Sequence, residues 1–216
     1  MPNLNEKLTF QQLSPMKNRI EQKFDLLKND KKAAFVAYVC GGDPTIDKSL
    51  EILLSIDEAG ADIIEIGIPF SDPLADGVVN QMAASRALNA GTTVPHIIDL
   101  IKSFRKHSQT PLVIFTYLNP IYNYGYERFH QDASIAGADG ILTLDLPPSE
   151  ENINEELCHA KGLLPIRLIA PTTPKARISQ IAKSGLGFIY YVSREGVTGK
   201  QTNLAEGIKE QILSIK

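Results

Sequence analysis

The residues best suited to chemistry in this chain are the carboxylates of the stretch Ala61–Gly77, ADIIEIGIPFSDPLADG. Its first half is a nearly continuous apolar run with Glu65 in the middle, which predicts a strand covered on both faces. Burying an unpaired carboxylate is costly, so we expect a shifted pKa or a dedicated partner for Glu65. The second half is typical of a loop and carries Asp72 and Asp76. We interpret the stretch as an acid/base site, and the alternative is a satisfied core glutamate beside a solvated loop.

Two further groups of residues could bind a substrate. The loop Ser193–Gly199, SREGVTG, has glycines that allow backbone amides to approach an anion such as phosphate, although it could equally be a plain connection. Tyr117 and Asn119 follow one predicted strand, and Tyr190 lies near the end of another. A tyrosine of either group could line an apolar pocket with its hydroxyl inward, or simply pack in the core.

Other kinds of chemistry find less support in the sequence. No Ser/His/Asp arrangement or reactive cysteine motif is present, and the four histidines lack metal-ligand spacing, so we expect no metal site and place each histidine at the surface or at a helix end. Cys40 and Cys158 lie far apart and are interpreted as reduced thiols of a cytoplasmic protein. The net charge of −3 without a Lys/Arg cluster gives no reason to expect nucleic acid. No apolar run is long enough to cross a bilayer, and no secretory signal is evident.

The elements that must position these residues alternate between strand and helix. Apolar runs predict strands at 33–39, 62–66, 112–116, 140–144, 164–169 and 188–192, and amphipathic runs predict helices at 46–59, 80–90, 95–107, 126–136, 150–161, 175–184 and 203–215. Residues 1–30 precede the first strand, with a pattern that suits a helix capping the bottom of a barrel. The alternation predicts one α/β domain, 1–216, with a parallel sheet and right-handed crossovers.

A repeated joint supports this interpretation. Ala59-Gly60-Ala61-Asp62 and Ala136-Gly137-Ala138-Asp139 both end a helix with glycine and start the next strand at once. Repeated βα units fit a (β/α) barrel or a doubly wound sheet. The barrel is favoured because no glycine-rich phosphate loop follows the first strand, and because the distinctive polar residues come after the strands, where barrel enzymes build their sites.

Taken together, the motifs resemble those of a known family, the tryptophan synthase alpha subunit. IEIGIPFSDPLADG resembles its signature, and FVAYVCGGDPT, TYLNPIYNYG, GADGILTLDLPPSEE, LIAPTTP and YYVSREGVTG resemble further segments in the family's order, over about residues 15–205. There are two small departures. Val78-Val79-Asn80 stands in place of the usual Pro-Thr-Ile, and Gly41 stands where the family commonly has alanine.

The resemblance implies a (β/α)8 TIM barrel that cleaves indole-3-glycerol phosphate to indole and glyceraldehyde 3-phosphate in tryptophan biosynthesis. Glu65 matches the family's catalytic glutamate, expected to protonate the indole carbon that is released. Asp76 matches its catalytic aspartate, expected to hold the proton of the indole nitrogen. Tyr190 and Tyr117 are expected in the substrate pocket, and Gly199 matches a glycine that contacts the phosphate.

The resemblance also implies a partner. Pro69, Asp72 and Asn119 fall on segments that typically meet the beta subunit in an alpha-two beta-two tetramer. Pyridoxal phosphate is expected in that beta partner, which receives indole through a tunnel, and no cofactor is expected in the alpha chain itself.

The sequence shows about six βα units where the family has eight. We therefore expect a barrel that does not close by itself, and a phosphate site without the amides of the last two loops. The alternative to an active enzyme is a truncated alpha chain that only binds the beta subunit. A third interpretation is another phosphate-handling barrel, which the paired Glu65 and Asp76 disfavour.

Overall fold

The computed structural model describes residues 17–147, 149–192 and 212–213. Its elements, in chain order, are α1 (Arg19–Asn29), β1 (Val36–Cys40), α2 (Ile46–Glu58), β2 (Ile63–Gly67), α3 (Val78–Asn89), α4 (Val94–Arg105), β3 (Leu112–Thr116), α5 (Leu118–Tyr124), α6 (Tyr126–Ala136), β4 (Gly140–Thr143), α7 (Glu151–Ala160), β5 (Leu164–Pro165), β6 (Arg167–Ile169), α8 (Lys175–Ser184) and β7 (Ile189–Tyr191).

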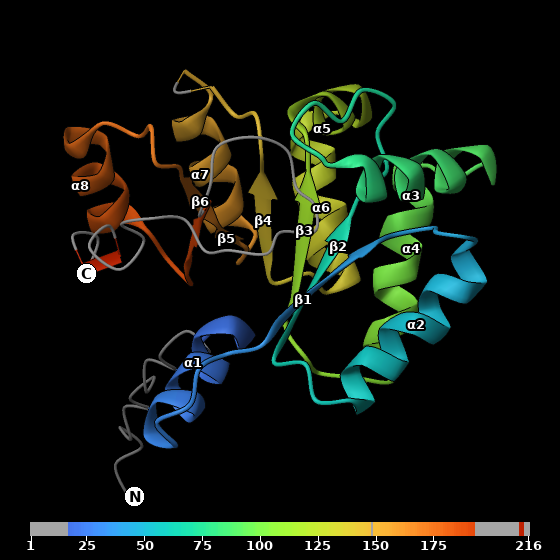
Figure 1. Cartoon of the computed structure of the whole chain (residues 1–216), viewed down its shortest axis with the longest axis horizontal. Helices are drawn as coiled ribbons and strands as arrows, with labels where there is room; N and C mark the ends of the chain where they lie inside the picture. Colours follow the sequence, from blue (N-terminus) through green and yellow to red (C-terminus); the bar gives the residue numbers. More distant parts are fainter. Residues whose placement is uncertain (1–16, 148, 193–211, 214–216) are drawn as a thin grey trace, which may run out of the picture.

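The strands form a parallel sheet wrapped by helices, as Figure 1 shows. Five strands pair in the order β1-β2-β3-β4-β5, so each strand lies beside its neighbour in sequence, and β6 pairs with β7. The helices α2, α4, α6 and α7 lie along one face of the sheet (Figure 1). This order, with a helix crossover between most neighbouring strands, is that of a (β/α) barrel and not of a doubly wound sheet. The expected α/β barrel type is confirmed. Among the described residues β1 pairs with β2 alone, so this part of the barrel is open at that edge.

Alternation along the strands separates two hydrophobic layers, because successive side chains point to opposite faces of a sheet. One layer, between the sheet and its helices, contains Ile64, Ile66, Leu112, Ile114 and Ile141 with Ile97, Ile101, Phe104 and Phe129. The other, inside the barrel, contains Ile63, Val113, Leu142, Leu164 and Ile166 with Ile20 of α1. Glu65 alternates with Ile64 and Ile66 and therefore lies on the inner face with Ile63.

Helix α1 closes the lower end of this inner layer. The side chain of Asn18 caps α1 by accepting from Ile20 N at 2.9 Å, and also donates to the backbone oxygens of Asp139 and Gly162 at 2.9 and 3.1 Å. Arg19 forms an ion pair with Asp139, from Nε to Oδ1 at 2.9 Å. A helix thus covers the barrel bottom, as expected for the region 1–30. This helix begins at Arg19, and residues 1–16 lie outside the described residues.

The structure corrects three sequence-based expectations. The predicted strand 164–169 is two strands: Leu164 and Pro165 pair with β4, and after Ile166 the chain pairs with β7. Helix α5 was not predicted, because its segment LNPIYNY lacks a clear apolar period. His130 was expected at the surface or a helix end, but it is completely buried, with Nδ1 2.8 Å from Tyr126 O and Nε2 3.1 Å from Asn154 Oδ1. The predicted helix 203–215 lies mostly outside the described residues.

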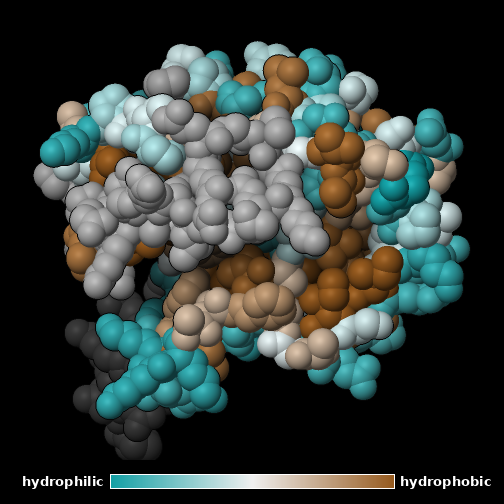
Figure 2. Space-filling model, viewed as in Figure 1, coloured by the Kyte–Doolittle hydropathy of each residue, from teal (hydrophilic) through white to brown (hydrophobic). Residues whose placement is uncertain are grey.

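The surface carries an apolar group that follows the acidic loop. Leu74, Val78, Val79 and Met82, at the end of that loop and on the first turns of α3, are each more than half exposed. Figure 2 shows hydrophobic side chains gathered on the part of this face where α3 and α2 lie. None of the helices in the described ranges is long and apolar enough to span a membrane.

Candidate active site

A cavity of about 480 Å³ lies at the carboxyl ends of the strands, where barrel enzymes place their sites. The residues around it come from the strands β1, β2, β3, β6 and β7, from the loops that follow β2, β4 and β7, and from the first turn of α3. They are Tyr38, Glu65, Leu74, Ala75, Asp76, Asn80, Phe115, Leu144, Leu168, Tyr190 and Val192. The cavity is mostly apolar, with two carboxylates among its walls, which is the usual character of a site for a largely apolar small molecule.

Glu65 is the buried acid of this cavity. It lies in β2 between buried isoleucines, and 3% of it is exposed. Burial raises the pKa of Glu65 from 4.5 to about 7, because the apolar surroundings disfavour the charged carboxylate. Its Oε1 has no hydrogen-bond partner among the described residues. A carboxyl group with a pKa near neutrality and a free oxygen can both give and take a proton at physiological pH.

Asp76 is the second carboxylate and is held by its neighbours. It lies in the loop between β2 and α3 and is 8% exposed. Its Oδ2 accepts a hydrogen bond of 2.9 Å from the Tyr117 hydroxyl, and its Oδ1 accepts one of 3.3 Å from Asn80 Nδ2. The same Tyr117 hydroxyl accepts from the backbone N–H of Ala75 at 2.9 Å. Tyr117, at the end of β3, therefore fixes both the loop and its carboxylate.

An aromatic row forms one wall of the cavity. The rings of Tyr38 and Phe115 meet edge to face at 5.1 Å, and those of Phe115 and Tyr190 at 6.2 Å. Gly67 makes room for this row, since a Cβ there would collide with the Tyr38 hydroxyl. The sequence pattern alone does not indicate Tyr38 as a site residue. The signal that could have found it is its position in the first strand, where parallel pairing sets it beside Glu65.

The other predicted site residues have different locations. Tyr190 lines the cavity, while Tyr117 is outside the cavity wall and donates a hydrogen bond to Asp76. Asp72 and Asn119 are exposed, as residues at an interface must be, whereas Pro69 is buried within the chain. Gly199 is outside the described residues. The roles of all these residues stay predictions.

No metal centre is found in the described parts of the chain, since no group of three histidine, cysteine or carboxylate side chains is arranged to bind an ion there. Both cysteines are buried and free.

Comparison with known proteins decides the family. The family model described as tryptophan synthase alpha chain matches residues 24–216. The alpha chains of Opitutus terrae and Geotalea daltonii are 45% and 43% identical to this chain over 199 and 198 residues, which are 92% of this chain and 75% of each relative. The chain belongs to the tryptophan synthase alpha chain family. The resemblance stated from the sequence is thereby confirmed.

Solved structures of the family share the fold. The alpha subunit from Legionella pneumophila is 39% identical and superposes with a TM-score of 0.78, over 81% of this chain and 67% of that one. A chain of tryptophan synthase from Mycobacterium tuberculosis is 30% identical, with a TM-score of 0.84 over 93% and 77% of the two chains. Membership of this family implies lyase activity in tryptophan biosynthesis.

Proposed function

We propose that this chain cleaves indole-3-glycerol phosphate by a retro-aldol reaction to indole and glyceraldehyde 3-phosphate. The observation that supports this best is that one cavity contains a carboxyl group with a pKa near neutrality and a second carboxylate that hydrogen bonds hold in place. Burial raises the pKa of Glu65 to about 7, while Asp76 is held by Tyr117 and Asn80. Two carboxyl groups in such different surroundings suit two different roles.

In the proposed reaction, protonated Glu65 gives its proton to the indole carbon that bears the glycerol phosphate chain. The ring becomes positively charged, and Asp76 accepts a hydrogen bond from the ring N–H and stabilises that charge. The Glu65 carboxylate then takes the proton from the hydroxyl on the adjacent chain carbon. The C–C bond breaks, its electron pair returns to the ring, and the hydroxyl carbon becomes the aldehyde. The proton count balances, because Glu65 ends as it began.

The walls of the cavity support an aromatic substrate. The row formed by Tyr38, Phe115 and Tyr190 offers ring faces and edges to an indole, and Leu144 and Leu168 offer apolar contact. We propose that the phosphate contacts the loop that contains Gly199, on the basis of the family resemblance.

We further propose that the chain binds the beta subunit in an alpha-two beta-two tetramer, with pyridoxal phosphate in that partner. The exposed Asp72 and Asn119 and the apolar group Leu74, Val78, Val79 and Met82 support a docking surface on this side. Pro69 would act there by shaping the loop, since its side chain is buried.

Release of indole from indole-3-glycerol phosphate tests the proposal. Glu65→Gln should lower kcat by about 10²- to 10⁴-fold, the usual contribution of a positioned acid or base. The matched control is Glu51→Gln, which changes an exposed glutamate of α2 that pairs with Lys48. Equal rates for Glu65→Gln and the unmodified chain would remove Glu65 from the mechanism.

A further inference from the structure

A partly buried arginine on the outer face of β6 has no role in the proposed chemistry. Arg167 lies between Ile166 and Leu168, and strand alternation directs those two neighbours to the barrel interior. Its own side chain is directed instead to the helical layer, and 11% of that side chain is exposed. A charged group so placed must be paired to offset its desolvation.

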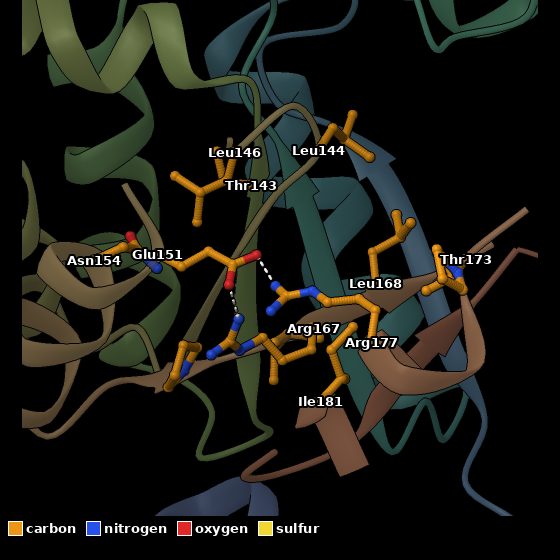
Figure 3. A pocket seen from close by; sticks show the side chains of 13 residues that line it. Thr143, Leu144, Leu146, Glu151, Asn154, Arg167, Leu168, Thr173, Arg177 and Ile181 are labelled. Atoms are coloured by element: carbon orange, nitrogen blue, oxygen red, sulfur yellow. Dashed lines mark hydrogen bonds and ion pairs between the residues drawn. The ribbon is translucent and has the colours of Figure 1, made fainter. Parts of the chain in front are cut away.

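The partners of Arg167 come from helix α7. Its Nη1 lies 3.3 Å from Oε2 of Glu151, and its Nη2 forms an ion pair with Glu155. Glu151 also accepts a hydrogen bond from Arg177 of α8. In Figure 3 the Glu151 carboxylate lies between the two guanidinium groups. We call these four residues the ion cluster. It ties β6 and α8 to α7, which follows β4.

The ion cluster bridges a place where the sheet divides. The N–H of Ile166 donates to Ile141 O at 2.9 Å, and beyond that point β6 pairs with β7 while β4 continues separately. A second cavity of about 290 Å³ occupies this division and is lined by Glu151, Arg167 and Arg177 among others.

The second cavity backs directly onto the candidate active site. Leu144, after β4, and Leu168, in β6, line both cavities. Between β4 and β6, the wall of the active-site cavity is therefore not held by a continuous strand ladder. Its spacing depends on what holds β6 against α7, and that is the ion cluster on the opposite side of the strand.

We infer that Arg167 is a positioning residue that sets the width of the aromatic pocket through Leu168. Removing Arg167 from this partly buried cluster leaves Glu155 without its partner and Glu151 with Arg177 alone, so Glu155 would move toward water and β6 would lose its link to α7. The pocket between Leu144 and Leu168 would then widen. This inference rests on the proposed function for its ligand, an indole ring, and concerns the shape of the pocket and not the proton transfers.

The experiment compares the binding of indole and the bulkier 5-methylindole to the full chain and its variants. Arg167→Leu should change the ratio of the two dissociation constants in favour of 5-methylindole by about 2- to 30-fold, the range seen for changes within a connected network. Arg167→Lys, which keeps a cation, should stay closer to the unmodified ratio. Arg177→Leu, at a more exposed position, should give a smaller change in the same direction.

Arg19→Leu is the matched control, because it also takes one of two paired arginines from a carboxylate, but at the barrel bottom. It should lower the melting temperature and leave the ratio unchanged. The inference is overturned if Arg167→Leu folds with an unchanged ratio, or if Arg19→Leu changes the ratio equally. If Arg167→Leu does not fold, Arg177→Leu takes its place: an unchanged ratio in that variant, or an equal change in Arg19→Leu, overturns the inference.

The inference and the proposed function can fail separately. If the unmodified chain binds neither indole, the proposed function fails. The separation of Leu144 and Leu168 in crystal structures of the unmodified chain and of Arg177→Leu then still tests the inference. A larger separation in the variant supports it, and an unchanged separation overturns it.

Discussion

The hydroxyl of Tyr117 donates a hydrogen bond of 2.9 Å to Oδ2 of Asp76, and so links the end of β3 to the loop that follows β2. The same oxygen accepts from Ala75 N. A loop carboxylate thus acquires a fixed position from a side chain in a different βα unit. Fixed orientation of a charged group is what stabilises charge as it develops in a transition state.

Tyr117→Phe should therefore lower kcat by about 10- to 100-fold and raise KM by a smaller factor. A loosened Asp76 still admits substrate but stabilises the charged ring poorly. Steady-state kinetics of indole release measures both constants. Tyr122→Phe is the control, since Tyr122 in α5 is 66% exposed. Rates for Tyr117→Phe within twofold of the unmodified chain would show that the hydrogen bond from Tyr117 to Asp76 does not matter for catalysis.

The raised pKa of Glu65 predicts a pH dependence of stability. The unfolded chain releases this proton near pH 4.5 and the folded chain near pH 7, so the folded state binds more protons in between. The contribution of Glu65 to stability is then fully present below pH 4.5 and is lost as pH rises toward 7, by about 3 kcal/mol in total. Chemical denaturation should show Glu65→Gln gaining stability relative to the unmodified chain between these limits. A difference that does not vary with pH would argue against the shifted pKa.

Gly41 has a packing reason for lacking a side chain. A Cβ there would lie 2.6 Å from Ile97 Cδ1 and 3.1 Å from Gly67 O. Gly41→Ala should cost about 1–3 kcal/mol of stability through overpacking. Ile97→Val removes the colliding methyl, so the double variant should lose less than the sum of the two single changes. Urea denaturation of the three variants measures this, and simple additivity would show that the two positions are not coupled.

Asp139 at the barrel bottom is buried and is the centre of a second group of ion pairs. Its Oδ2 accepts from Arg105 Nη2 at 2.9 Å and from Leu112 N at 2.8 Å, and its Oδ1 pairs with Arg19 of α1. Asp139→Asn should lower the free energy of unfolding by about 3–5 kcal/mol, because it removes the only carboxylate paired with the partly buried Arg105 guanidinium among the described residues. The affinity for indole should be unchanged under conditions where the variant is folded. A thermal melt and a binding titration check the two parts of this prediction. Weakened indole binding in the folded variant would show that the barrel bottom and the active-site end are not independent.

The local sequence pattern was enough to locate the repeating units and to single out Glu65 as the candidate acid. The alternation of apolar runs with amphipathic ones locates most helices and strands, since side-chain periodicity is a local property. The strand around Glu65 already implied burial and, with it, either a shifted pKa or a dedicated partner, because a carboxylate inside an apolar run has no local partner. The order of the motifs was enough to recognise the family.

Tertiary structure alone decided which distant side chains meet. The bond from Tyr117 to Asp76 joins residues 41 apart in the chain, and Arg167 finds its partners on a helix that precedes it. Tyr38 joins the cavity through strand pairing, and His130 is buried by packing against α7. At Ile166 the apolar run 164–169 changes its pairing partner from β4 to β7. Each of these depends on long-range contacts, which the local pattern of a sequence does not encode. The burial of Glu65 could therefore be predicted from its own strand, whereas the groups that position Asp76 and shape the pocket are brought together only in the folded chain.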